Sequence, residues 1–158
     1  MNKGCQDRLL PLTVLYSPFL RLRYRCSLAK CCNTINALAN KAIFQMPAEA
    51  PRNLAVELEQ RKTQPPSGTV YVEDSEGRKA TDSSVKTFGD VDQFSGMVYL
   101  PESEGELSTI SVTMHALCQL LGMEQNDDNN SIMRKNSSER TKVLSEQDVK
   151  ILIKVLGC

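Results

Sequence analysis

Apolar positions along the chain follow two different periods, and these periods predict the order of its elements. Residues 11–17 have the alternation of a strand. From Ser27, which is taken as a cap, to about Phe44, apolar residues recur at intervals of three and four, which predicts the first helix. Three shorter apolar runs are further strand candidates: residues 54–58, 69–73 and 96–100.

The second half of the chain contains two patterns that are typical of helices. One predicts a helix from residue 108 or 109 to about residue 121, where Gly122 ends it as a helix C-cap glycine does. The other follows Ser145, where the sequence Ser-Glu-Gln-Asp resembles a capping box with Asp148 in place of the usual Glu or Gln. Gly157 closes this last helix.

The stretch between the middle strands differs from the rest of the chain. Residues 74–95 are rich in Gly, Asp and Ser and have no strong period, which predicts a long loop. The expected order is therefore strand, helix, two or three strands, helix, irregular turn and helix. This order favours an α+β fold in which a mixed, twisted sheet packs against helices in one domain. We expect residues 1–9 to form an N-terminal tail and residues 10–158 to form the domain.

The composition of the chain argues against several classes of function. The chain has 158 residues, the length of about one domain, and it contains no apolar run long enough to span a membrane. Basic and acidic residues both number 19, which argues against a nucleic-acid partner because such partners require a basic field. The chain has one histidine, His115, so no site that needs two or three histidines can be built within it.

Charge is distributed unevenly along the chain. Residues 1–44 have a net charge of +6, which indicates either one solvated face of the domain or a surface for an anionic partner. Within them, Arg21, Arg23 and Arg25 alternate with apolar residues, which predicts a solvated face of an extended segment. The six cysteines contain no Cys-x-x-Cys pair, so a zinc ribbon is not supported. No clear signal peptide is recognisable, and the compartment is not predicted.

Residues 115–133 contain the motif with the most chemical content, His-Ala-Leu-Cys-Gln-Leu-Leu-Gly followed by a polar turn and Met133. This segment resembles the zinc-binding motif of the metzincin metalloproteases, H-E-x-x-H-x-x-G-x-x-H, and the methionine turn that follows it. In that motif three histidines bind one zinc ion, and the Glu activates a zinc-bound water. The resemblance places His115 at the first ligand position and Gly122 at the turn. The spacing to Met133 is similar to that of the matrixin branch.

Three positions depart from the metzincin motif. Ala116 stands where the catalytic Glu is expected, and Gln119 and Gln125 stand at the second and third ligand positions. An amide oxygen is a poor zinc ligand compared with imidazole, and alanine cannot act as a base. The resemblance therefore implies a degenerate site without a catalytic residue, in which His115 is the one remaining family ligand and Met133 packs beneath it.

The strand at 96–100 and the last helix extend the resemblance. The strand looks like the edge strand that binds substrate ahead of the zinc helix, and the helix after Ser145 is similar to the closing helix of the family. The resemblance implies a groove beside this strand that accepts an extended peptide by strand addition. The residues expected to form that edge are Met97, Val98, Tyr99 and Leu100.

Three functions are compatible with these observations. The first is a pseudoprotease, a metzincin-like domain without zinc or catalysis that binds an extended peptide or protein in the former cleft. The second is a zinc-dependent endopeptidase with an altered site, in which Cys118 or acidic side chains join His115 or a partner chain completes the site. The third is an interaction module whose basic N-terminal third docks an anionic partner. No cofactor is expected for the first and third functions, and zinc is expected for the second.

Overall fold

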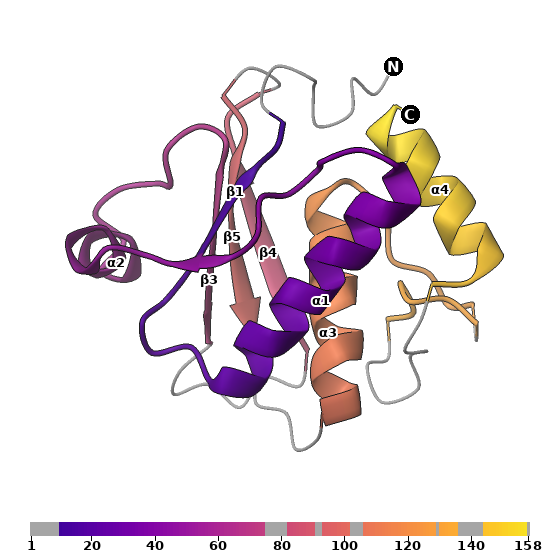
Figure 1. The fold of residues 1–158 in the computed structure, drawn as a ribbon, viewed down its shortest axis with the longest axis horizontal. Coiled ribbons are helices and arrows are strands. Elements are labelled where there is room, and N and C mark those ends of the chain that lie inside the picture. Colours follow the sequence, from indigo (N-terminus) through magenta and orange to yellow (C-terminus); the bar gives the residue numbers. More distant parts are fainter. Residues whose placement is uncertain are drawn as a thin grey trace.

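The computed structural model shows a small α+β domain with a mixed five-stranded sheet and four helices (Figure 1). It describes residues 10–74, 82–90, 93–101, 106–128, 130–135 and 144–157, with residues 106–108 as backbone only. The elements are β1 (Thr13–Tyr16), α1 (Leu22–Ala39), β2 (Ala48–Glu49), α2 (Arg52–Glu59), β3 (Thr69–Asp74), β4 (Ser84–Phe88), β5 (Ser95–Leu100), α3 (Glu106–Leu120) and α4 (Glu146–Leu156). No helix of these residues is long and apolar enough to cross a membrane.

The sheet has the strand order β2-β1-β3-β5-β4. Three of its pairings are parallel, whereas β4 runs antiparallel to β5 and forms an edge of the sheet. The central strand β3 is buried on both faces, as parallel strands covered by helices are. The register aligns Tyr71 with Met97 and Met97 with Lys86, so these three side chains share one face.

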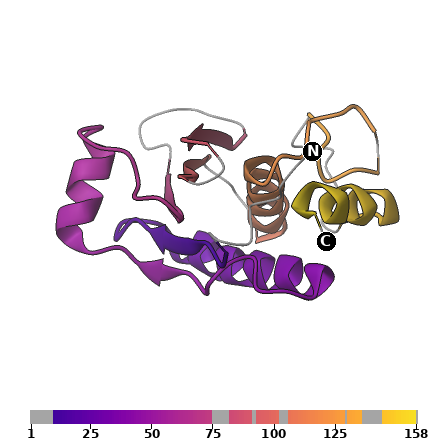
Figure 2. The same cartoon turned by 90° about the horizontal axis from the view of Figure 1, so that it is seen from above.

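Helices cover the two faces of the sheet unequally. Helices α1, α3 and α4 lie on one side, and α2 lies alone on the other (Figures 1 and 2). The larger core forms beneath the three helices and includes Val72, Val98 and Leu100 from the sheet. The smaller core lies under α2 and includes Tyr71 and Met97.

One glycine allows α3 to approach the sheet closely. A Cβ atom added to Gly96 of β5 would lie 2.5 Å from Cδ1 of Leu120, a residue at the end of α3 that is 3% exposed. A larger residue at this position would overpack the core. Gly96 thus fixes the distance between β5 and the helix that carries His115.

The structure corrects the predicted boundaries of the first helix. This helix begins at Leu22, five residues before Ser27, and it ends at Ala39, after which Asn40 adopts a left-handed conformation. The Ser27 hydroxyl lies 2.8 Å from the Thr109 hydroxyl of α3, so it links two helices and caps neither. The interpretation of residues 21–25 as extended was therefore wrong.

Two further predictions about the elements were also wrong. Residues 54–58 belong to α2, because their apolar side chains recur at the helical spacing of four residues. The expected loop at 74–95 contains the strand β4. The predictions for β1, β3, β5, α3 and α4 are confirmed, including the Ser145 capping box and the left-handed Gly157. The predicted tail at 1–9 lies outside the described residues.

Candidate functional site

His115 lies on the fully buried part of α3, and its imidazole has two partners. Nδ1 lies 2.9 Å from the backbone carbonyl oxygen of Ile132. A carbonyl oxygen can only accept, so Nδ1 carries a proton and donates it. In the neutral ring Nε2 is then an acceptor, and the side-chain amide nitrogen of Gln125 lies 3.2 Å from it. The ring orientation is therefore fixed at both nitrogens.

The turn that follows α3 closes on itself and presents the Ile132 carbonyl to His115. The backbone nitrogen of Asn126 donates to Met133 O at 3.0 Å, and that of Lys135 donates to Asn126 O at 2.9 Å. Met133 is 0% exposed and belongs to the larger core. Met133, the residue expected at the methionine turn, therefore follows Ile132, whose carbonyl oxygen bonds to His115. Its side chain packs in the larger core.

Asp148 holds this turn from the first turn of α4. Its carboxylate, which is 1% exposed, accepts hydrogen bonds from the Ser131 hydroxyl at 2.7 Å and from the Ile132 backbone nitrogen at 2.8 Å. It also accepts from the Ser145 backbone nitrogen at 3.2 Å, which completes the capping box. One carboxylate therefore caps a helix and fixes the turn that orients His115.

Ser131 connects Asp148 with the rest of the turn. Its hydroxyl donates to Asp148 and accepts from the backbone nitrogen of Met133 at 3.0 Å and from the Asn126 side-chain amide at 3.1 Å. We call Asn126, Ser131, Ile132 and Asp148 the turn clamp. Sequence reasoning identified Asp148 as a capping residue but missed its second role, because that role depends on contacts 16 and 17 residues away.

The positions that resemble the remaining metzincin site contain no further strong ligand. Ala116 is 0% exposed and is part of the larger apolar core. Gln119 is half-buried, and its buried Oε1 has no hydrogen-bond partner. Among the described residues there is no group of three His, Cys, Asp or Glu side chains that could hold a metal ion. One imidazole and two amides do not fit zinc, which prefers imidazole, thiolate and carboxylate ligands.

Other side chains near His115 are poorly suited to bind zinc together with it. Cys118 is completely buried, its neighbours include Cys31 of α1 and Asp148, and burial raises the pKa of its thiol. A thiol must lose its proton to bind zinc, so this environment opposes binding. Glu124, Asp127 and Asp128 are all exposed to solvent. The structure therefore gives no support to a site in which these groups join His115.

The strand expected to form a substrate-binding edge lies inside the sheet. Strand β5, which contains Met97, Val98, Tyr99 and Leu100, pairs with β3 on one side and β4 on the other. It is an interior strand, so the prediction that residues 96–100 form the edge was wrong. The edge next to β5 is β4, which the polar composition of residues 74–95 concealed.

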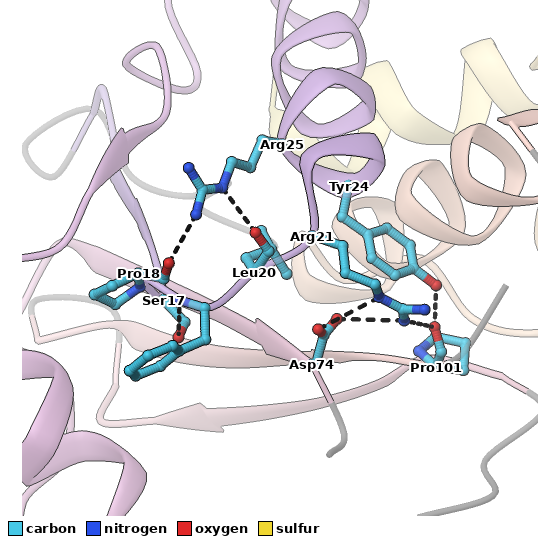
Figure 3. Close-up of polar contacts among 9 residues, drawn as sticks. Ser17, Pro18, Leu20, Arg21, Tyr24, Arg25, Asp74 and Pro101 are labelled. Carbon is cyan, nitrogen blue, oxygen red and sulfur yellow. Dashed lines mark hydrogen bonds and ion pairs between the residues drawn. The ribbon is translucent and has the colours of Figure 1, made fainter.

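The basic residues near the start of α1 are largely engaged within the domain. The Arg21 guanidinium lies 3.4 Å from Asp74 at the end of β3 and donates to the Pro101 carbonyl at 3.1 Å (Figure 3). Tyr24 also donates to the Pro101 carbonyl, and burial raises its pKa to about 12. These contacts connect α1 to the carboxyl ends of β3 and β5.

Arg25, the third arginine of this group, is similarly placed. It donates to the carbonyl oxygens of Leu20 and Pro18, both at 2.7 Å, and so braces the loop before α1 (Figure 3). The positive charge of the N-terminal third is thus partly structural. This observation weakens the hypothesis that these arginines serve chiefly to dock an anionic partner.

Comparison with known proteins does not assign the chain to a family, because no family model and no curated protein matches it. Its family and its function are therefore proposals that rest on its own residues.

Proposed function

We propose that the chain is a metzincin-like, matrixin-like domain without zinc or catalysis, a pseudoprotease that retains a place for an extended peptide. The order of its elements supports the resemblance: a mixed sheet, the helix with His115, a turn with buried Met133, and a capped closing helix. The observation that carries the proposal is the approach of Gln125 to His115, since these residues stand at the third and first ligand positions of the motif.

The distance between the side-chain nitrogens of His115 and Gln125 is close to that between two nitrogen ligands of one zinc ion. Two nitrogen atoms that bind one tetrahedral zinc ion at about 2.0–2.1 Å lie roughly 3.4 Å apart. Nε2 of His115 and Nε2 of Gln125 are separated by 3.2 Å. This separation is compatible with two ligand positions of one site, and here the two side chains form a direct hydrogen bond. At the second ligand position, the buried Oε1 of Gln119 has no hydrogen-bond partner.

The position expected for the catalytic base argues against hydrolysis independently of the metal. Ala116 is packed within the apolar core. A carboxylate there would be desolvated unless it were paired, which is costly. A positioned general base contributes about 10²–10⁴-fold to a rate. The alanine thus contributes an apolar group to the core and no catalytic base.

Strand β4 supports the peptide-binding part of the proposal. Among the described residues β4 pairs with β5 alone, so backbone donors and acceptors along its outer side are available for another strand. Peptides commonly bind to such an edge by strand addition. We therefore place the peptide along Ser84–Phe88, and not along the interior strand β5.

The test restores the ligands that are missing. Zinc content is measured by elemental mass spectrometry after zinc loading and dialysis, for the natural chain and for the double variant Gln119→His, Gln125→His. We expect nearly no zinc in the natural chain and close to one zinc ion per chain in the double variant. Adding His115→Ala to the double variant is the matched control and should abolish the binding.

Two outcomes would contradict the proposal. If the natural chain holds one zinc ion that His115→Ala removes, or cleaves peptides in a chelator-sensitive manner, the site is not degenerate. If the double variant folds, as judged by circular dichroism, but binds no zinc, the three positions do not converge and the metzincin resemblance is rejected.

A further inference from the structure

A pocket of about 250 Å³ lies on the face of the sheet opposite to His115. It forms where α2 ends, between residues 61–64 and the strands β4 and β5. Its apolar lining includes Met97 and Tyr99 of β5 and Phe88 of β4. The sheet separates the pocket from His115, but Lys86 and Phe88 of its lining belong to β4, the strand along which the proposed peptide lies. A ligand held by the side chains of the pocket does not depend on strand addition at that edge.

Three cationic side chains line this pocket: Arg61, Lys62 and Lys86. The Lys86 ammonium lies 5.4 Å from the centroid of the Phe88 ring. Among the described residues no carboxylate forms an ion pair with Lys62 or Lys86. Two positive charges at the rim are therefore available to an anionic ligand.

Arg61 is held in place more firmly than the two lysines. Its backbone has a positive φ of 62°, and its guanidinium donates to Leu58 O at 3.0 Å and to Glu73 at 3.4 Å. The same guanidinium lies 5.2 Å from the centroid of the Tyr99 ring. These contacts fix a cation against the aromatic wall of the pocket before any ligand binds, which lowers the cost of ordering it.

Two carboxylates lie close to one another on this side of the sheet: Glu59, which accepts a hydrogen bond from Tyr71, and Glu73. Glu73, whose side chain is 10% exposed, is the acidic partner of Arg61. Burial raises the pKa of Glu73 to about 7, with Arg61 acting in the opposite direction. A substantial share of this carboxyl is therefore neutral at physiological pH. The cations that line the pocket thus exceed the negative charge beside them.

We propose that this pocket binds a small organic carboxylate with an aromatic or short aliphatic body. The carboxylate contacts Lys62 and Lys86, and the body packs against Met97 and Tyr99. Charge complementarity selects an anion, and the apolar lining selects a ligand that carries more than the anionic group. The volume lies below the roughly 300–1,000 Å³ of pockets for drug-sized ligands, which limits the ligand to a small molecule.

The proposal is tested with 3-phenylpropionate as the probe and its neutral analogue 3-phenylpropionamide as the comparison. Binding is followed by NMR titration of the full chain, with the Met97 methyl group and the backbone amides of residues 61–64 and 84–88 as reporters. We expect saturable shifts at these positions with the carboxylate. The amide should bind about fivefold more weakly, since an exposed ion pair contributes up to about 1 kcal/mol.

Two charge variants distinguish the pocket from the overall charge of the chain. Lys86→Gln should weaken binding of 3-phenylpropionate by about fivefold. Lys150→Gln on the exposed surface of α4 removes the same charge far from the pocket and should leave binding unchanged. The proposal is overturned by an absence of saturable shifts, by equal affinity for acid and amide, or by equal effects of the two variants.

Discussion

Replacing Asp148 by alanine should both destabilise the domain and release His115. The substitution removes the acceptor of three hydrogen bonds, from Ser131 Oγ, Ile132 N and Ser145 N. Ser131 and Ile132 are almost fully buried, so their donors would lose a partner without gaining water. Each such loss costs about 1–3 kcal/mol, and the lost helix cap costs about 1 kcal/mol more. We expect a total loss of roughly 3–7 kcal/mol in the free energy of unfolding.

Two measurements follow the consequences of this change separately. Urea unfolding monitored by circular dichroism gives the free energy of unfolding. The nitrogen chemical shifts of the histidine ring report its tautomer, and they are unambiguous because the chain has one histidine. In the natural chain the proton should lie on Nδ1, where the Ile132 carbonyl accepts it. In Asp148→Ala the turn loses its anchor, and the proton should be shared between the two nitrogens.

Neighbouring residues provide the controls for this prediction. Ser145→Ala removes the other half of the capping box and should cost about 1 kcal/mol without altering the histidine ring. Glu146→Ala lies in the same helical turn but is exposed, and it should change stability by less than about 0.5 kcal/mol. An Asp148→Ala variant that loses under 1 kcal/mol and keeps the natural ring signals would refute the role assigned to the turn clamp.

Two further predictions concern the other face and the edge of the sheet. The pKa of Glu73 is raised from 4.5 to about 7, chiefly by burial, so its contribution to stability is fully present below pH 4.5 and is lost as the pH rises through 7. Between pH 4 and pH 8, the free energy of unfolding of the natural chain, measured in urea, should fall by at most about 3 kcal/mol more than that of Glu73→Gln. If the free energies of the two proteins change in parallel with pH, this prediction is contradicted. At the edge strand β4, peptides that bind the natural chain should be obtained from a randomised heptapeptide library. Proline is then introduced at Lys86 in one variant and at Thr87 in another, because the N–H groups of neighbouring residues point to opposite sides of the strand. The variant that stays folded lacks the outward-facing N–H and should no longer bind these peptides; unchanged binding would exclude strand addition at β4.

Elements were predicted correctly where the residues that define them lie close together in the sequence. The last helix was predicted correctly because Ser145 and Asp148 lie three residues apart and form the cap within one turn. The start of α1 was missed because Arg21, its N-cap residue, makes no side-chain cap, and Ser27 offered a more typical one. The Ser27 hydroxyl in fact contacts Thr109, which is 82 residues away. Such a contact leaves no local pattern.

The sheet shows the same division between local and distant information. Strand β5 was found from its own apolar run, but its position depends on pairings with β3 and β4 that its sequence does not encode. Strand β4 was hidden because it is an edge strand with exposed polar positions, and its flanking residues resemble a loop. At the candidate site, the spacing of His115, Gln125 and Met133 was visible in the sequence. The approach of Gln125 to the imidazole and the second role of Asp148 required the structure.

The presence of His115 and Met133 at these positions can be explained without any metal. His115 donates to the Ile132 carbonyl and accepts from Gln125, so a buried polar side chain has partners at both ring nitrogens. Met133 fills the larger core, and the turn between them joins α3 to the cap of α4. These interactions stabilise the fold whether or not zinc binds. Under the proposed function, the two residues that match the motif are therefore residues with a role in the fold. The three positions that depart from it hold Ala116, Gln119 and Gln125, which supply no base and no strong zinc ligand.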